Sequence, residues 1–363
     1  MSELSWGPMK QDDLFDSRSS VHKLVETYTA EELLKKSGNH VREPGRNAPI
    51  DVLAGRRGAK TIRSAAKRAV LAMELDLANG KLTDALHAYG YAAWAHAGLP
   101  RRDLKEPSRP WVVTTDYARL EVQPGTRRED GDGPSEYIGV PYGSYARLAM
   151  LHWQSVAYKT GSREVFIGRS ISDALKQMNL PHNSDANSQL REQIDRLSVC
   201  TIRFSVEGGG KGLMLNHTLV EEAEYAYQRS ISGKGGDRRF IQRLILTKAY
   251  YDQLMKFPVT MDETAILELR DSPTALDIYT WLCWRLPYIK DEARIGWTSL
   301  KAQLGPNIKS MSDFKPVFRV CFMAAHAVYR GADMELADFG VILRPSPPPV
   351  PQRRLVNGVS LAR

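Results

Sequence analysis

The sequence feature that most constrains the fold is a succession of amphipathic segments between residues 137 and 219. The first segment, "YIGVPYGSYARLAMLHWQSVAYKTGS", has apolar residues at helical spacing and predicts a buried helix. In "GRSISDALKQMNL", Ser170 and Asp173 have the spacing of a helix cap, and Pro181 follows where the helix is expected to stop. A third helix with one apolar face is predicted over "SDANSQLREQIDRLSV".

A β-hairpin is predicted next, because "TIRFSVE" and "LMLNHTL" alternate at period two around the turn "GGGKG". The same order recurs in "DSPTALDIYTWLCWRLPYI", "ARIGWTSLKAQLG", "SMSDFKPVFRVCFMAAHAVY" and "ADMELADFGVILRPS". Three helices followed by a hairpin is the order of a winged helix, which places one helix in the DNA major groove and the hairpin against phosphates or the minor groove. The alternative is generic α+β packing of the same apolar faces.

We therefore expect an α+β protein with two tandem winged-helix domains related by an internal repeat. The expected parts are a flexible N-terminal arm (1–60), a helical N-terminal extension (61–110), the first winged-helix domain (111–236), the second winged-helix domain (237–350) and a C-terminal tail (351–363).

The N-terminal parts follow from local composition. The arm is polar and rich in glycine, proline and asparagine, which are typical of loops. Alanine and leucine at helical spacing over residues 62–94 predict two helices that separate near Asn79 and Gly80. The run "WVVTTDYARLEVQPG" alternates like a strand.

Charge and cysteine usage narrow the class of protein. The formal net charge of +8 and the pI near 9.3 favour an anionic partner such as nucleic acid, although a solvated basic surface has the same balance. Cys200, Cys283 and Cys321 lie in apolar surroundings without metal-site spacing, which indicates reduced core residues of a cytosolic protein. Because signal-sequence and membrane-spanning patterns are lacking, we expect a soluble protein with no membrane contact.

Several segments closely resemble the RepA-type plasmid replication initiators, and the resemblance runs from "AGLPRRD" to "SPPPV". It is clearest in "GVPYGSYARLAMLHWQSVAYKTGSREVFIGRSISDALKQMNL", "LREQIDRL", "SPTALDIYTWLCWRL" and "LRPSPPPV". The resemblance implies tandem winged helices that bind repeated double-stranded sites, called iterons, at a plasmid origin. It further implies origin opening, recruitment of host replication proteins such as the helicase or its loader, and a bacterial cytoplasmic location. A homodimer in equilibrium with the monomer, repression of its own gene by the dimer, and plasmid copy control are also implied.

The third helix of the first domain is the first candidate for DNA contact. With Leu190, Ile194 and Leu197 directed inward, the outward face is expected to hold Ser188, Glu192, Asp195 and Arg196. The candidate DNA-binding residues of this domain are Arg169, Lys176, Asn187, Arg191, Arg196 and Lys211. A solvated surface charge is the alternative for each basic residue. Lys211 is favoured because its glycine neighbours let the backbone approach a groove.

The corresponding helix of the second domain is the favoured base-specific element. Phe314, Phe318, Cys321 and Phe322 are expected to face the core, which places Ser312, Lys315, Arg319 and Met323 outward or at the side. An arginine there can pair with the acceptor edge of guanine. The candidates are Ser312, Lys315 and Arg319 for this helix, with Lys301, Lys309 and Arg344 as phosphate contacts. Pro316 lacks an amide donor, so the start of this helix is in question.

Catalytic patterns are weak in this sequence. The eight histidines are dispersed, so the paired-histidine metal site of rolling-circle initiators is not formed. "GGGKGL" and "SGKGGD" lack the spacing and the Ser or Thr of a phosphate-binding loop. We expect no enzymatic activity, no catalytic residues, no cofactor and no metal. The alternatives are a winged-helix transcriptional regulator that never opens an origin and, from another class, a priming or nicking enzyme.

Overall fold

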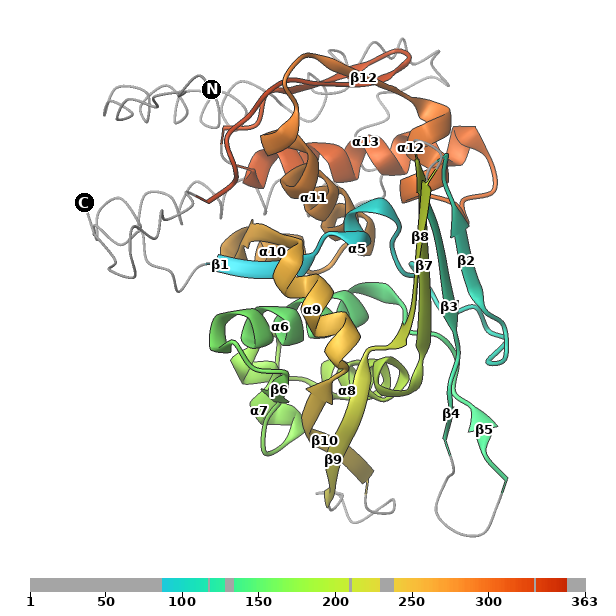
Figure 1. Cartoon of the computed structure of the whole chain (residues 1–363), viewed down its shortest axis with the longest axis vertical. Coiled ribbons are helices and arrows are strands. Elements are labelled where there is room, and N and C mark those ends of the chain that lie inside the picture. The colour runs from blue at the N-terminus through green and yellow to red at the C-terminus, as the bar shows by residue number, and fades with distance from the viewer. Residues whose placement is uncertain are drawn as a thin grey trace, which may run out of the picture.

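The computed structural model describes residues 87–350, apart from residues 117, 128–133, 209–210, 229–237 and 330. The predicted arm (1–60), the predicted helices up to residue 86 and the predicted tail (351–363) lie outside the described residues. Helices and several small sheets are mixed along the described part, which confirms the α+β class (Figure 1).

The first predicted succession of elements is present. Its elements are α6 (Gly143–Thr160), β6 (Glu164–Phe166), α7 (Ile171–Gln177), α8 (Ser184–Val199), β7 (Thr201–Gly208) and β8 (Lys211–Thr218). The predicted cap of α7 is confirmed, since Ser170 Oγ accepts a hydrogen bond from the Asp173 amide at 3.1 Å. Helix α6 ends at Gly161, whose φ of 65° is the left-handed conformation that glycine adopts without strain.

The second predicted succession is also present, and Figure 1 shows its helices at the upper end of the molecule, with α6, α7 and α8 of the first in the lower half. Its elements are α11 (Pro273–Arg285), β12 (Ala293–Gly296), α12 (Trp297–Leu304), α13 (Met311–Val328), β13 (Met334–Ala337) and β14 (Gly340–Leu343). Ser272 caps α11 and Ser310 caps α13, each through a hydrogen bond from an amide of the first turn.

Strand pairing follows the same rule in both successions: the predicted hairpin takes part in the second, and a different hairpin takes part in the first. In the second, β12 pairs with β14, and the sheet order is β12-β14-β13. In the first, β6 pairs with the later strand β10 (Arg238–Leu246), in the order β6-β10-β9 with β9 (Val220–Gln228). The hairpin β9–β10 therefore has the topological place of β13–β14, which the sequence assigned to β7–β8.

The hairpin β7–β8 instead completes a four-stranded sheet of order β2-β3-β7-β8. Its other strands are β2 (Trp111–Thr114) and β3 (Ala118–Gln123). The prediction of one strand across "WVVTTDYARLEVQPG" is wrong, because the chain reverses after Thr114 and forms the two strands β2 and β3. The Thr115 Oγ1 accepts a hydrogen bond from the Ala118 amide at 3.0 Å, which closes the turn.

The second helix predicted within residues 62–94 is wrong over residues 87–91, because His87–Tyr91 is strand β1. It pairs with β11 (Pro258–Asp262), far away in the sequence. Side chains of α6 satisfy its other edge, where Ser155 Oγ and Gln154 Oε1 accept the Tyr89 and Tyr91 amides at 2.8 and 2.9 Å. These tertiary hydrogen bonds outweigh the helical preference of Ala88, the one alanine of this strand. From residue 87 onward, the described part of the second predicted helix contains one helix, α5 (Ala93–His96).

We call the elements from α6 to β10 the first unit and those from α11 to β14 the second unit. Shorter elements lie before, within and between these units. They are β4 (Thr126–Arg127), β5 (Glu136–Tyr137), α9 (Lys248–Lys256), α10 (Glu263–Leu269) and the 3₁₀ turn η2 (Leu286–Tyr288). The predicted domain boundary between residues 236 and 237 stays a prediction; β10, on its far side, pairs with β6 and β9 on its near side. Across the described ranges, no helix is both long enough and apolar enough to span a bilayer.

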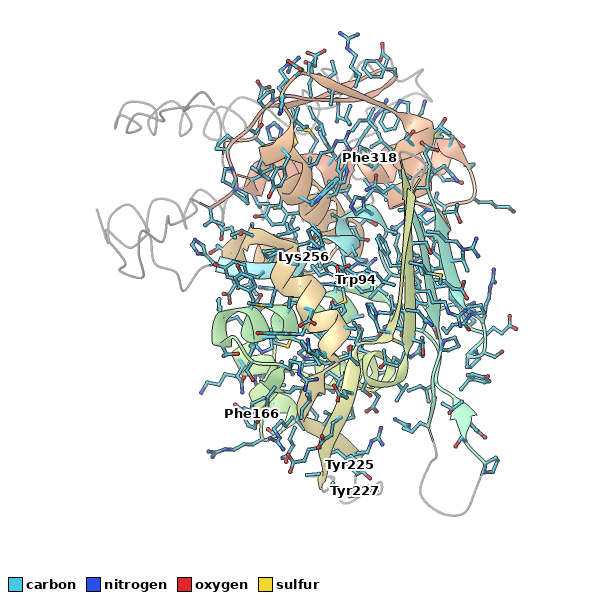
Figure 2. All side chains as sticks on the ribbon, viewed as in Figure 1. Trp94, Phe166, Tyr225, Tyr227, Lys256 and Phe318 are labelled. Atoms are coloured by element: carbon cyan, nitrogen blue, oxygen red, sulfur yellow. The ribbon has the colours of Figure 1, made fainter. Side chains whose placement is uncertain are left out.

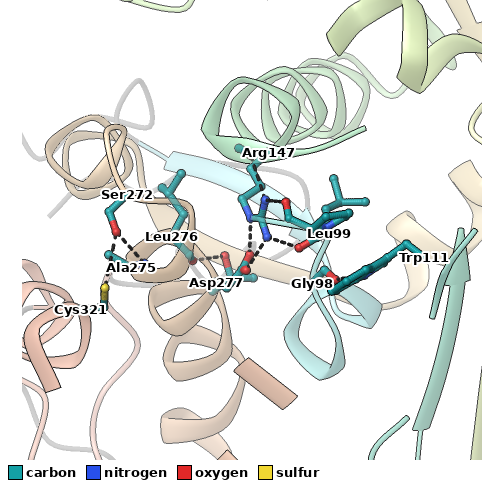
Figure 3. A network of polar contacts seen from close by, with 12 residues as sticks. Gly98, Leu99, Trp111, Arg147, Ser272, Ala275, Leu276, Asp277 and Cys321 are labelled. Carbon is teal, nitrogen blue, oxygen red and sulfur yellow. Dashed lines mark hydrogen bonds and ion pairs between the residues drawn. The ribbon is translucent and has the colours of Figure 1, made fainter. Parts of the chain in front are cut away.

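One continuous hydrophobic core runs through both successions. Cys200, Cys283 and Cys321 are buried free thiols, which confirms their prediction as core residues. A polar link crosses the core between α6 and α11, where Arg147 forms a two-pronged ion pair with Asp277 at 2.6 Å (Figure 3). The same guanidinium also donates to the carbonyls of Leu99, Pro100 and Gly143, so each of its N–H groups has an acceptor.

Candidate nucleic-acid interface

Helix α8 presents its N-terminal half to solvent and buries one apolar face. Asn183 Oδ1 accepts a hydrogen bond from the Ala186 amide at 2.8 Å and fixes the start of the helix. Leu190, Ile194 and Leu197 are fully buried, which confirms the predicted inward face. The exposed residues of the N-terminal half are Ser184, Asp185, Ser188 and Gln189.

The outward positions predicted for Asp195 and Arg196 are wrong, since both side chains are buried. Arg196 Nη1 lies 3.0 Å from Asp103 Oδ1, and its Nη2 lies 2.7 Å from Glu192 Oε1. Its guanidinium carbon is 4.9 Å from the centroid of the Tyr142 ring. With these contacts, the Arg196 guanidinium holds α8 against the preceding loops and is not directed to a phosphate.

Asp195 is shared by two arginines from distant strands. Arg127 Nη1 of β4 lies 2.6 Å from Asp195 Oδ2, and Arg239 Nη2 of β10 lies 3.5 Å from Asp195 Oδ1. Burial raises the pKa of the Asp195 carboxyl, and the two arginines act in the opposite direction. A helical wheel cannot include these partners, which is why the buried carboxylate was expected in solvent.

The other candidates of the first unit differ in exposure. Arg169 and Lys176 are exposed, immediately before α7 and in its last turn. Asn187 and Arg191 of α8 are half-buried, and Arg191 Nη1 donates to the Arg239 carbonyl at 2.6 Å. Lys211 begins β8, but its side chain lies outside the described residues. Contact of these residues with DNA stays a prediction.

Helix α13 has the predicted aromatic inner face. Phe314, Phe318, Cys321 and Phe322 are buried, and Figure 2 shows Phe318 inside the upper end of the molecule. Ser312 is exposed in the first turn, and its hydroxyl lies 2.7 Å from that of Ser310.

Lys315 and Arg319 of α13, both predicted to contact DNA, lie beside the same ring, the indole of Trp297. Lys315 Nζ lies 5.3 Å and the Arg319 guanidinium carbon 5.4 Å from the Trp297 ring centroid. Burial lowers the pKa of Arg319, and Asp338 opposes this effect. Stacking uses the face of a guanidinium, whereas its N–H donors lie in the plane, so a stacked arginine can still donate to a base edge.

Pro316 does not delay the start of α13. The helix begins at Met311, with Ser310 Oγ accepting the Asp313 amide at 3.0 Å, and it continues through Pro316. The proline therefore removes the amide that would bond to the Ser312 carbonyl, and Ser312 is exposed, so water can replace that donor.

The three phosphate candidates of the second unit have unequal surroundings. Lys301 is half-buried in the last turn of α12, and Lys309 is exposed between α12 and α13. Arg344 is surrounded by acidic groups, with its nitrogens 3.1, 3.1 and 3.3 Å from carboxylate oxygens of Glu292, Asp333 and Glu335. This acidic neighbourhood disfavours a phosphate beside Arg344.

The sequence analysis missed an exposed aromatic pair on β9. Tyr225 and Tyr227 are 48% and 52% exposed, and Figure 2 shows them at the lower end of the molecule. The Arg239 guanidinium lies 4.8 Å from the Tyr225 ring centroid. The available signal was the alternating run "AEYAYQ", in which a tyrosine occupies every second position of a strand.

Comparisons with known proteins add one finding to this geometry. No curated protein matches the chain. A crystal structure of domains 2 and 3 of RctB aligns with 67% of this chain and 83% of its own chain. The two sequences are 12% identical, and the TM-score is 0.38. A second structure, of selenomethionine derivatives of the same domains, has the same identity and TM-score over 60% and 78%. Residues 140–298 match the family of the plasmid-encoded RepA protein, which confirms for this part of the chain the family that its segments resemble.

Proposed function

We propose that this chain is a plasmid replication initiator that binds repeated double-stranded DNA sites, or iterons, at a plasmid origin through two tandem winged-helix units. The observation that carries the proposal is the duplicated topology. In each unit, a strand after the first helix pairs with the last strand of a later hairpin, giving the orders β6-β10-β9 and β12-β14-β13. The family match over residues 140–298 supports the plasmid context.

In this proposal α8 and α13 enter successive major grooves, since each is the last helix before the hairpin strands of its unit. Helix α13 makes the base-specific contacts through Lys315 and Arg319, which Trp297 supports from one side. Arg169, Lys176, Lys301 and Lys309 contact phosphate. Arg196 and Arg344 are not part of the proposed DNA interface, because each already forms ion pairs with carboxylates of the protein.

The proposal extends to the events after binding. The bound initiator opens the origin and recruits host replication proteins, the helicase or its loader, in the bacterial cytoplasm. A homodimer in equilibrium with the monomer represses the gene and limits plasmid copy number. The chain itself has no enzymatic activity in this scheme.

Footprinting on the DNA that flanks the gene, followed by competition in gel shifts, tests the proposal. We expect protection of a repeated sequence, and we expect random duplex to compete at least 1,000-fold less well at physiological salt, as is typical of specific binders. Equal competition by random duplex would contradict site-specific binding. Nucleotide incorporation or strand cleavage in the presence of Mg²⁺ or Mn²⁺ would instead support the priming or nicking enzyme.

A further inference from the structure

The hairpin β9–β10 presents an unusual aromatic surface. The rings of Tyr225 and Tyr227 meet edge to face at 6.0 Å between centroids, and about half of each side chain is exposed. Alternate residues of a strand share a face, so both rings belong to one side of β9. Single exposed aromatics need no explanation, whereas a contiguous pair indicates a binding surface.

This tyrosine face has basic neighbours. Arg239 lies directly opposite Tyr227 in the strand register, and its guanidinium is placed over Tyr225. Arg239 shares the single carboxylate of Asp195 with Arg127, and both arginine side chains remain about one quarter exposed. The three charges sum to +1, which favours an anionic partner.

The opposite face of the same hairpin is acidic. Arg243 lies opposite both Glu224 and Phe166, and opposite residues share a face. Its guanidinium is already paired with Glu224 at 2.8 Å and Glu164 at 2.7 Å. Glu222 is exposed on this side as well. A polyanion is therefore attracted to the tyrosine face and repelled from the glutamate face.

Helix α8 is attached to the tyrosine face. Arg191 of α8 donates to the Arg239 carbonyl at 2.6 Å, and Asp195 of α8 pairs with the Arg239 side chain. DNA that lies along α8 therefore meets Arg239 and its tyrosine neighbours at a fixed position relative to the helix.

The second unit repeats the arrangement at the equivalent hairpin. Phe339, in the turn between β13 and β14, is 42% exposed, and the Arg294 guanidinium lies 5.9 Å from its ring centroid. Arg294 belongs to β12, the strand that pairs with β14, so in both units an exposed aromatic ring of the hairpin has an arginine beside it.

We propose that Tyr225, Tyr227 and Arg239 bind the sugar–phosphate backbone of duplex DNA, so that β9–β10 rather than β7–β8 is the DNA-contacting hairpin of the first unit. This inference rests on the proposed function for its DNA ligand. The tyrosine hydroxyls donate to phosphate oxygens, the rings pack against deoxyribose, and the guanidinium pairs with phosphate. Such contacts fix the position of the protein on DNA without discriminating between sequences.

The test compares Tyr225→Ala/Tyr227→Ala with Phe166→Ala, a matched control on the opposite face of the same sheet that is 47% exposed. Fluorescence anisotropy measures the Kd of the full chain for the footprinted duplex and for a random-sequence duplex. We expect the tyrosine variant to bind both duplexes roughly tenfold more weakly, by a similar factor, because it loses the hydroxyl hydrogen bonds and the ring contacts with deoxyribose together. The control should bind like the unmodified chain.

The outcomes separate this inference from the proposed function. Equal Kd values for both duplexes in the unmodified chain would refute site-specific initiation, while a weaker tyrosine variant would still support the hairpin contact. Unchanged binding by the tyrosine variant would overturn the hairpin contact and leave initiation standing. The hairpin contact would also be overturned if the tyrosine variant had a lower molecular mass in solution than the unmodified chain and bound DNA equally well. The tyrosine face would then be the surface that joins two copies of the chain.

A milder variant keeps the test decisive if the double alanine variant misfolds. Tyr225→Phe/Tyr227→Phe keeps both rings and removes only the hydroxyl donors. We expect a loss of roughly threefold in affinity for each duplex, with unchanged circular dichroism and Tm. No loss in this variant and none in Arg239→Lys would overturn the contact.

Discussion

Removing one partner of the buried ion pair between Arg147 and Asp277 should lower the unfolding free energy strongly. The two side chains are 3% and 16% exposed, and both prongs measure 2.6 Å (Figure 3). Asp277→Asn removes the negative charge and leaves a buried guanidinium beside a neutral amide. Loss of one partner from such a pair typically costs about 3–5 kcal/mol, so we expect a decrease of this size.

Arg147→Met should destabilise by a similar amount, because it leaves the Asp277 carboxylate buried and removes the donor to the Leu99 carbonyl. The double variant Arg147→Met/Asp277→Leu removes both charges. We expect it to recover more than half of either single loss, with about 1–2 kcal/mol remaining for the Leu99 carbonyl.

Urea unfolding, followed by circular dichroism, measures these differences in a double-mutant cycle. The pair Lys248–Asp252 provides a control with the same 2.6 Å separation, but its side chains are 76% and 51% exposed. Asp252→Asn should change stability by less than about 0.5 kcal/mol. If Asp277→Asn is as mild as this control, or if the two core substitutions add, the argument from burial is refuted.

Three further predictions follow from single groups. Burial, and less strongly Lys159, lowers the pKa of His152 to about 4. As the pH falls, the His152 imidazole is therefore protonated in the unfolded chain at a higher pH than in the folded protein. About 2 kcal/mol of stability should therefore be lost as the pH falls from about 6.5 to 4.5, and urea titrations of His152→Gln should show a smaller fall. Ser310→Ala should cost about 1 kcal/mol through loss of the α13 cap, and calorimetry should find Ser312→Ala nearly neutral. Arg319→Ala should weaken binding to the cognate repeat by about 1–3 kcal/mol and relax the preference at one base pair, and an unchanged preference on single-base variants would refute its base-specific role.

Local patterns in the sequence were sufficient for the three helices of each succession. Ser170 and Asp173 identify the cap of α7, and the spacing of Leu190 and Phe318 within their helices identifies the buried faces. These features depend on residues within one or two turns, so they are visible in a short stretch of sequence.

Features that depend on distant residues were missed. The partners of Asp195 come from β4 and β10, and the partner of β1 is β11, so a helical wheel or a propensity scale contains no information about them. The same limit explains the choice of hairpin. The turn "GGGKG" is a strong local signal for β7–β8, whereas the pairing of β6 with β10 depends on strand order alone.

The pairing of β1 with β11 has a consequence for synthesis on the ribosome. Strand β1 is translated first among the described elements, but its partner follows only after the whole first unit has been made. At typical translation rates of about 5–20 residues per second, β1 waits roughly 10–30 seconds for β11 to emerge. Early folding of α6 covers one edge of β1 through Ser155 and Gln154, but the edge that receives β11 stays open to other nascent chains during that interval.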